Sequence, residues 1–254
     1  MGRLLQSKAF AIALGLTTLV GVFAILEGLL RAGIVNRYIV PLPSDVILSL
    51  ERIIIEENVV GRVRETAYEM LVSCIAVIVL GIPIGTALFR YKALRRAMED
   101  WVAALAAAPL VLAFPLFLVM FGRSSMTIIV MSTITGLAPI IIKTTEGLIG
   151  VRQVLINVGL SLKLTQSQMF RKILLPAALP VIFSGIRLSW TFVLISVVGI
   201  EFLINLGGLG QLINDLAERY DLPGTYASIG FVILVSIGFF VILERLEKWL
   251  RPAT

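Results

Sequence analysis

The segment KTTEGLIGVRQVLINVGLSLKLTQSQMFRKILLPAALPVIFSGIRLSW, residues 143–190, decides how this chain folds. A polar interval lies between two apolar runs, and each run is long enough to cross a bilayer, which takes about 20 residues of α-helix. Val151–Leu162 predicts a short amphipathic helix. Thr165 and Gln168 have the spacing of a capping box that opens a second helix, which we expect to end or kink at Pro176. A helix–turn–helix of this kind at the membrane face is suited to docking a soluble partner, because its apolar positions would otherwise face water.

Composition indicates an integral membrane protein. Of 254 residues, 58% are hydrophobic, and the charges are confined to short intervals, which is not typical of soluble domains. The chain has no histidine and one cysteine, Cys74, which excludes histidine general-base catalysis, Cys/His metal sites and an intrachain disulfide. It also lacks a Gly-x-x-x-x-Gly-Lys-Ser/Thr phosphate loop. We therefore expect no enzyme, no metal site and no cofactor bound by this chain.

The apolar runs predict an all-α polytopic fold in one transmembrane domain, residues 1–254. Six spans are expected, at about residues 10–30, 66–89, 101–121, 126–142, 177–204 and 226–243, with a loop at 143–176. Prolines and glycines are expected to interrupt three of them: Gly81, Pro83 and Gly85 in the second, Pro109 and Pro115 in the third, and Gly136 and Pro139 in the fourth.

Basic residues set the predicted orientation. Of the 22 lysines and arginines, 14 lie on the side of the N-terminus, the 143–176 loop and the C-terminus, 7 lie on the other side, and Arg187 is inside the fifth span. The positive-inside rule therefore places both termini and the loop in the cytoplasm. Because the basic residues lie beside apolar spans, the net charge of +6 indicates topology rather than nucleic-acid binding.

Two elements are expected on the outer side. After Pro41 and Pro43, Ser44 is predicted to cap an amphipathic helix that runs through Ile55. The interval 205–225 is rich in acidic residues and contains a Leu-Gly-Gly-Leu-Gly run, which predicts a tight turn against a neighbouring segment. This side could meet an extracytoplasmic partner.

Five motifs occur in a recognisable order along the chain. They are Pro41, Pro43 and Ser44; Pro109, Pro115, Leu116, Phe121 and Gly122; Ile173 to Pro180; Gly185, Arg187 and Leu188; and Glu201 before Gly207, Gly208 and Gly210. Over about residues 25–251 they resemble the inner-membrane permeases of binding-protein-dependent ABC importers, and more narrowly the nitrate/sulfonate/taurine type.

The resemblance implies a type I ABC importer permease with a cytoplasmic coupling helix, located in a bacterial or archaeal inner membrane. Its implied partners are two ATPase subunits that carry ATP and Mg, a second permease that is identical or not, an extracytoplasmic binding protein, and the lipid bilayer. The implied cargo is a small anion or small organic acid, and composition does not choose among these.

Two sets of site residues are predicted. The ATPase-coupling set is Val154, Leu155, Asn157, Val158, Gly159, Leu160, Ser161, Leu162 and Lys163, and the alternative is a helix lying in the lipid headgroup layer. The substrate-path set is Pro109, Pro115, Ser189, Trp190, Ser196 and Glu201. The alternatives for this second set are simple helix bending, helix packing and, for Glu201, a structural hydrogen bond near the outer end of its span.

The signature loop departs from the family pattern. The family's Glu-Ala-Ala positions fall on Asn157, Val158 and Gly159, and its central glycine falls on Lys163. A lysine takes positive φ only at a cost of about 1 kcal/mol. Either the turn is built differently, with Gly159 taking part of the role, or the loop is partly degenerate.

Two other classes of function stay open. A secondary transporter would carry coupling charges near the bilayer midplane, where Glu201 is the one candidate. A membrane scaffold subunit without a transport pathway would share the same topology.

Overall fold

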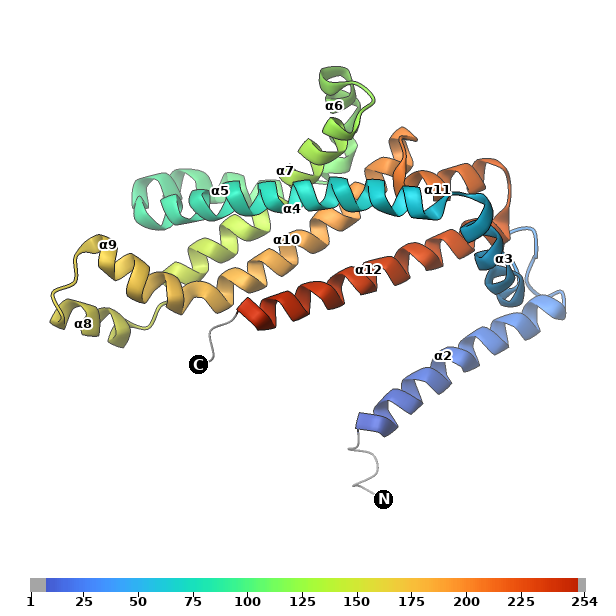
Figure 1. Cartoon of the computed structure of the whole chain (residues 1–254), viewed down its shortest axis with the longest axis horizontal. Helices are drawn as coiled ribbons and strands as arrows, with labels where there is room; N and C mark the ends of the chain where they lie inside the picture. The colour runs from blue at the N-terminus through green and yellow to red at the C-terminus, as the bar shows by residue number, and fades with distance from the viewer. Residues whose placement is uncertain (1–7, 251–254) are drawn as a thin grey trace. The chain divides into compact units, whose positions relative to one another are not determined.

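The computed structural model describes residues 8–250, and over these residues the chain is helical without strands (Figure 1). The helices are α2 (Lys8–Arg31), α3 (Pro43–Glu56), α4 (Val59–Arg90), α5 (Lys92–Ala107), the 3₁₀ turn η1 (Leu110–Ala113), α6 (Phe114–Phe121), α7 (Ser125–Ile149), α8 (Gln153–Ser161), α9 (Gln166–Met169), the π-helical turn η2 (Phe170–Leu174), α10 (Leu175–Ile204), α11 (Gly208–Glu218) and α12 (Leu222–Leu250). The predicted all-α fold is confirmed.

Within the described residues, five segments are long and apolar enough to cross a membrane. They lie in α2, α4, α7, the continuous run from α9 to α10, and α12. A sixth crossing results if α5 and the η1–α6 segment are one broken span, because they meet at an angle of 86°. Ala108 and Pro109 separate these two pieces, so the predicted bend in the third span is present.

The expected breaks in α4 and α7 are wrong, since both helices run through their glycines and prolines. Pro83 and Pro139 lie inside unbroken helices, although each lacks the backbone N–H that would donate to the carbonyl four residues earlier. The glycines serve close packing instead. A Cβ on Gly85 would lie 2.7 Å from Thr144 Cβ of α7, and the Thr145 hydroxyl donates to the Gly85 carbonyl at 3.0 Å. Small residues of this kind let membrane helices approach each other closely.

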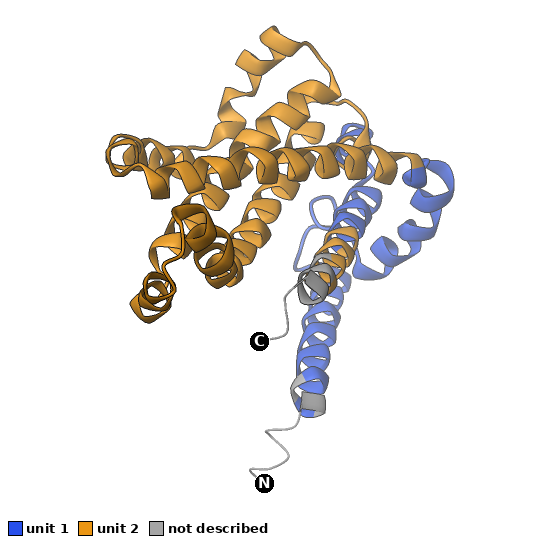
Figure 2. Ribbon diagram, turned by 60° about the vertical axis from the view of Figure 1, so that its left-hand side comes forward, with its two compact units in different colours: residues 1–60, 212–233 blue, residues 61–211, 234–254 orange. Residues whose placement is uncertain are grey.

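The chain divides into two compact units, residues 1–60 with 212–233 and residues 61–211 with 234–254 (Figure 2). The second unit holds the main apolar core, built mostly from α4, α7 and α10, including Val77, Ile128 and Val193. α7 packs along α10, and a Cβ on Gly136 would lie 2.7 Å from Val193 Cγ2. This α7–α10 pair therefore forms the centre of the unit.

In the first unit, the predicted outer amphipathic helix is present as α3, but Ser44 does not cap it. Leu42 is the N-cap and Pro43 occupies the first turn. The Ser44 backbone N–H and hydroxyl instead donate to the two carboxylate oxygens of Glu27 in α2, at 3.1 and 2.8 Å. Glu27 thus places a negative charge near the N-terminus of α3, where the helix dipole makes that charge stabilising.

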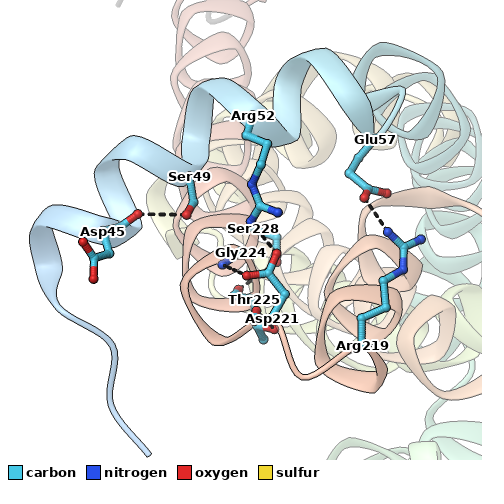
Figure 3. Close-up of polar contacts among 9 residues, drawn as sticks. All are labelled: Asp45, Ser49, Arg52, Glu57, Arg219, Asp221, Gly224, Thr225 and Ser228. Carbon is cyan, nitrogen blue, oxygen red and sulfur yellow. Dashed lines mark hydrogen bonds and ion pairs between the residues drawn. The ribbon is translucent and has the colours of Figure 1, made fainter. Parts of the chain in front are cut away.

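Two ion pairs hold α3 within the same unit (Figure 3). The Arg52 guanidinium pairs with the Asp221 carboxylate, and Arg219 Nη1 lies 2.6 Å from Glu57 Oε1. Asp221 also accepts a hydrogen bond from the Gly224 backbone N–H at 3.1 Å, in the first turn of α12. α3 is therefore fastened to the connection between α11 and α12.

Candidate coupling loop and membrane pathway

The predicted coupling loop, called the coupling loop below, consists of α8, the turn after it, α9 and η2. One face of α8 packs inward, where Leu155 and Ile156 contact a buried cluster that contains Leu148 and Ala178. Gly159 is buried on the same side. A Cβ there would lie 2.6 Å from both Ile173 Cδ1 and Met169 Cε. Gly159 therefore lets the two arms of the loop pack together, and Leu155 and Gly159 of the predicted coupling set face the loop's own core.

The opposite face of α8 carries apolar side chains that nothing covers in the described chain. Val154, Val158 and Leu162 follow each other at intervals of four residues, which places them along one face of the helix. Val154 is 70% exposed and Leu162 is 67% exposed. Leu160 is 61% exposed on another side of the helix, because it lies two positions from Val158 and from Leu162. Asn157, Ser161 and Lys163 are also exposed. The seven remaining predicted coupling residues are thus accessible, and Val154, Val158 and Leu162 form an exposed apolar row among them.

The turn between the arms has the geometry that a glycine would favour, although the residue is a lysine. Lys163 has φ +49°, in the left-handed region. The backbone N–H of Leu164 donates to the Gly159 carbonyl at 3.1 Å, as in the ends of many helices. Gly159 itself lies within α8 and has no positive φ. The turn is therefore built at Lys163, and Gly159 does not replace it.

The second arm begins as expected and then continues through Pro176, where an end or a kink was expected. Thr165 Oγ1 accepts from the Gln168 N–H and the Gln168 side chain accepts from the Thr165 N–H, which is the predicted capping box. The helix does not end at Pro176. It passes through η2 and enters α10 with Pro176 in the first turn. A π-helical turn shifts the hydrogen-bond pattern by one residue, so the proline is accommodated without a break.

The predicted path residues fall into two places within the second unit. Pro109 and Pro115 lie at the bend between α5 and α6 and are exposed. Ser189 and Ser196 are buried on α10 and face α7, where Ser196 Oγ lies 3.4 Å from Thr135 Oγ1. Trp190 contacts the ring of Phe239, with centroids 6.2 Å apart. The path assignment stays a prediction for all of them.

Glu201 is completely buried near the C-terminal end of α10 and takes part in a hydrogen-bonded clamp. Its Oε1 accepts from the Thr66 hydroxyl at 2.7 Å, and its Oε2 accepts from the Gly210 N–H at 2.8 Å. Glu65 accepts from the Gly208 N–H at 2.9 Å. Carboxylates from α4 and α10 therefore satisfy the free N–H groups at the start of α11. The substrate-path role of Glu201 stays a prediction.

The glycines after α10 make this clamp possible. Gly207 and Gly208 have φ of +64° and +73°, which residues with a side chain rarely adopt. A Cβ on Gly208 would overlap the Glu201 carboxylate, and a Cβ on Gly210 would overlap the Val198 carbonyl oxygen. The predicted tight turn against a neighbouring segment is present.

Sequence reasoning missed the partners of Glu201. Thr66 is buried. Glu69 lies one turn further along α4, is 3% exposed, and has its carboxyl group beside the carboxyl group of Glu201. Within residues 8–250, Glu69 Oε2 has no hydrogen-bond partner. A carboxylate inside the predicted second span was the available signal, because such residues are rare in membranes without a role.

Residues 77–254 match the family described as "Binding-protein-dependent transport system inner membrane component". The chain belongs to this family. It is therefore a membrane protein of a family of transport permeases, the permease subunits of ABC importers.

Relatives of this permease are named for several cargoes. A putative aliphatic sulfonates transport permease of Bacillus subtilis is 27% identical, with 91% of this chain and 84% of that protein covered. A nitrate import permease of Synechocystis sp. is 36% identical over 69% of this chain and 62% of that protein. The solved MetNI methionine ABC transporter in an inward-facing conformation matches with a TM-score of 0.65 and 21% identity, over 75% of this chain and 94% of that one. This last likeness concerns the fold of the permease.

Proposed function

We propose that this permease imports a small anion or small organic acid and that α8 is the surface on which its ATPase docks. The names of the sulfonate and nitrate relatives support the cargo class. The exposed apolar row on α8 carries the docking assignment, because a rigid, apolar helix face needs a partner surface. Burying such side chains contributes about 1.5–3 kcal/mol each, so three anchors can supply much of the energy of a stable contact.

The complete transporter contains two permeases, identical or not, and two ATPase subunits that bind ATP and Mg. An extracytoplasmic binding protein delivers the cargo to the side that carries α3 and α11. Both termini and the coupling loop lie in the cytoplasm of the bacterial or archaeal cell in this proposal, which the excess of basic residues on that side supports. This chain contributes no nucleotide site of its own.

ATP hydrolysis is coupled to transport through the continuous helix that runs from α9 through η2 into α10. When the ATPases close, they displace the exposed face of α8, and the packed arms of the loop carry this movement through η2 into α10. The broken α5–α6 segment then allows the pathway to open on one side at a time. Ser189, Trp190 and Ser196 on α10, with Pro109 and Pro115 at the bend, contribute to that pathway.

Reconstitution tests the proposal. The permease, its ATPase and the binding protein are placed in liposomes, and uptake of labelled nitrate, an aliphatic sulfonate and a formylaminopyrimidine is measured with ATP or ADP inside. A formylaminopyrimidine is included because another relative is named as its permease. We expect ATP-dependent uptake of one of the anions. Uptake without ATP would instead indicate a secondary transporter, and a stable complex without uptake would indicate a scaffold.

A further inference from the structure

A cavity of about 1000 Å³ lies within the second unit, between the α4–α5 junction and the second arm of the coupling loop. Phe89, Arg90 and Lys92 line one side of it, and Met169, Phe170 and Arg171 line the other. Neither the predicted transport pathway nor the exposed face of α8 includes these side chains. The cavity is therefore a separate feature of the permease.

The charge of the cavity has one sign. Its lining includes three cations, Arg90, Lys92 and Arg171, and no carboxylate. Arg90 Nη2 donates to the neutral Gln166 Oε1 at 3.0 Å. In the part of the chain that the structure describes, no ion pair neutralises any of the three cations. The charge of the lining therefore favours binding of an anion.

The walls and the size exclude a small ion as the natural occupant. Phe89, Phe170 and Leu174 give the cavity apolar walls, and its volume reaches the upper end of the range for small-molecule sites. An inorganic phosphate ion would leave most of this space and all of these apolar walls in contact with water. A molecule with a compact anionic group and a large apolar part matches the lining.

The cavity lies where a span ends. Arg90 is the last residue of the apolar α4 span, and the continuous helix from Gln166 to Ile204 has 39 residues. That helix is roughly 60 Å long, about twice the thickness of the hydrocarbon core, so its first turns extend beyond the core. Basic pockets between helices at this level bind anionic lipid headgroups.

We propose that this cavity binds an anionic phospholipid, with its phosphate between Arg90, Lys92 and Arg171 and its glycerol and upper acyl chain against Phe89, Phe170 and Leu174. The bound lipid joins the α4–α5 junction to the second arm of the coupling loop. Lipid binding requires only the purified permease, so its test stands apart from the import proposal.

The test uses the full chain purified in detergent and counts retained lipid by native mass spectrometry, after addition of phosphatidylglycerol or, in parallel, phosphatidylcholine. The triple variant Arg90→Gln, Lys92→Gln, Arg171→Gln removes the cavity charges. The matched control Arg95→Gln, Arg96→Gln, Lys172→Gln removes the same net charge from nearby positions that do not line the cavity. We expect the cavity variant to bind phosphatidylglycerol at least ten-fold more weakly than the control, which keeps wild-type binding.

Four results would overturn the proposal. The first is equal phosphatidylglycerol binding by the two triple variants. The second is that the wild type retains phosphatidylcholine as well as it retains phosphatidylglycerol. The third is displacement of phosphatidylglycerol by millimolar inorganic phosphate, which would assign the cavity to a free anion. Intact lipid binding together with loss of ATPase co-purification in the cavity variant also contradicts it, because the cavity would then belong to the ATPase interface.

Discussion

The Thr66 hydroxyl joins Glu201 to the start of α11. It donates to Glu201 Oε1 at 2.7 Å and accepts from the Leu209 N–H at 2.8 Å, while the second oxygen of Glu201 accepts from Gly210. α4 is thereby joined to the end of α10 and the start of α11, more than 130 positions further along the chain, by one small set of buried hydrogen bonds. Buried polar groups of this kind are costly to leave unpaired.

Thr66→Val should destabilise the permease by about 1–3 kcal/mol, because it keeps the shape of the side chain and leaves the Leu209 N–H and one oxygen of Glu201 without a partner. Thermal unfolding of the purified protein in detergent measures this. Thr66→Ser is the matched control, since it keeps the hydroxyl, and it should stay close to wild type. Equal melting temperatures for the valine and serine variants would show that the hydroxyl contributes little.

Gly210→Ala should disrupt the turn after α10, because its Cβ would overlap the backbone oxygen of Val198, which cannot move as a side chain can. We expect a fall in stability of more than 2 kcal/mol and loss of folded protein on size-exclusion chromatography. Gly199→Ala is the control, as no atom lies within 4 Å of its added Cβ. That helical position should gain about 0.5–1 kcal/mol instead.

Local signals predicted much of the fold, and non-local packing decided the rest. Pro109 marked the bend in the third span, and Thr165 with Gln168 marked the start of α9, because both effects act within one helical turn. Pro83 did not break α4, since the fit of α4 against α7 was not visible in sequence. The partnership of Thr66 with Glu201 spans 135 positions, which no local pattern can reveal.

Val158→Asp should abolish co-purification of the permease with its ATPase and leave membrane insertion unchanged. Val158 is half exposed in the middle of the apolar row, and truncating a central anchor of an interface costs about 2 kcal/mol or more. Pull-down in one detergent measures the effect. Gln153→Glu introduces the same charge at the start of α8, outside the row, and should retain the ATPase.

Retention of wild-type ATPase levels by Val158→Asp would support a helix lying in the headgroup layer instead. Gly159→Arg is a poorer test of docking, because its side chain would push against Met169 and Ile173 and separate the two arms of the loop.

Lys163→Gly should stabilise the coupling loop by up to about 1 kcal/mol, because the backbone already has φ +49° there and glycine removes the steric cost of that conformation. Hydrogen exchange of the loop amides in the purified permease should slow accordingly. Lys172→Gly is the comparison, as Lys172 lies in the helical turn η2, and glycine should speed exchange there. Faster exchange in Lys163→Gly would contradict the expectation.

Cysteine labelling checks the orientation. With a membrane-impermeant maleimide on intact cells, cysteines at Arg96 and Gln153 should stay unlabelled until the cells are opened, and a cysteine at Glu51 should react from outside. The native Cys74 is buried, so its background should be low. Labelling of position 153 in intact cells would reverse the predicted topology.

The continuous helix from α9 to α10 also fixes a rotational phase between the two ends of the permease. Pro176, beside the coupling loop, and Glu201, in the buried clamp, share one helix without an intervening break. Inserting a single residue between them would turn Glu201 by about 100° relative to Pro176, since an α-helix has 3.6 residues per turn. The carboxylate would then point away from Thr66 and Gly210. The number of residues in α10 is therefore as much a part of the clamp as the side chains that form it.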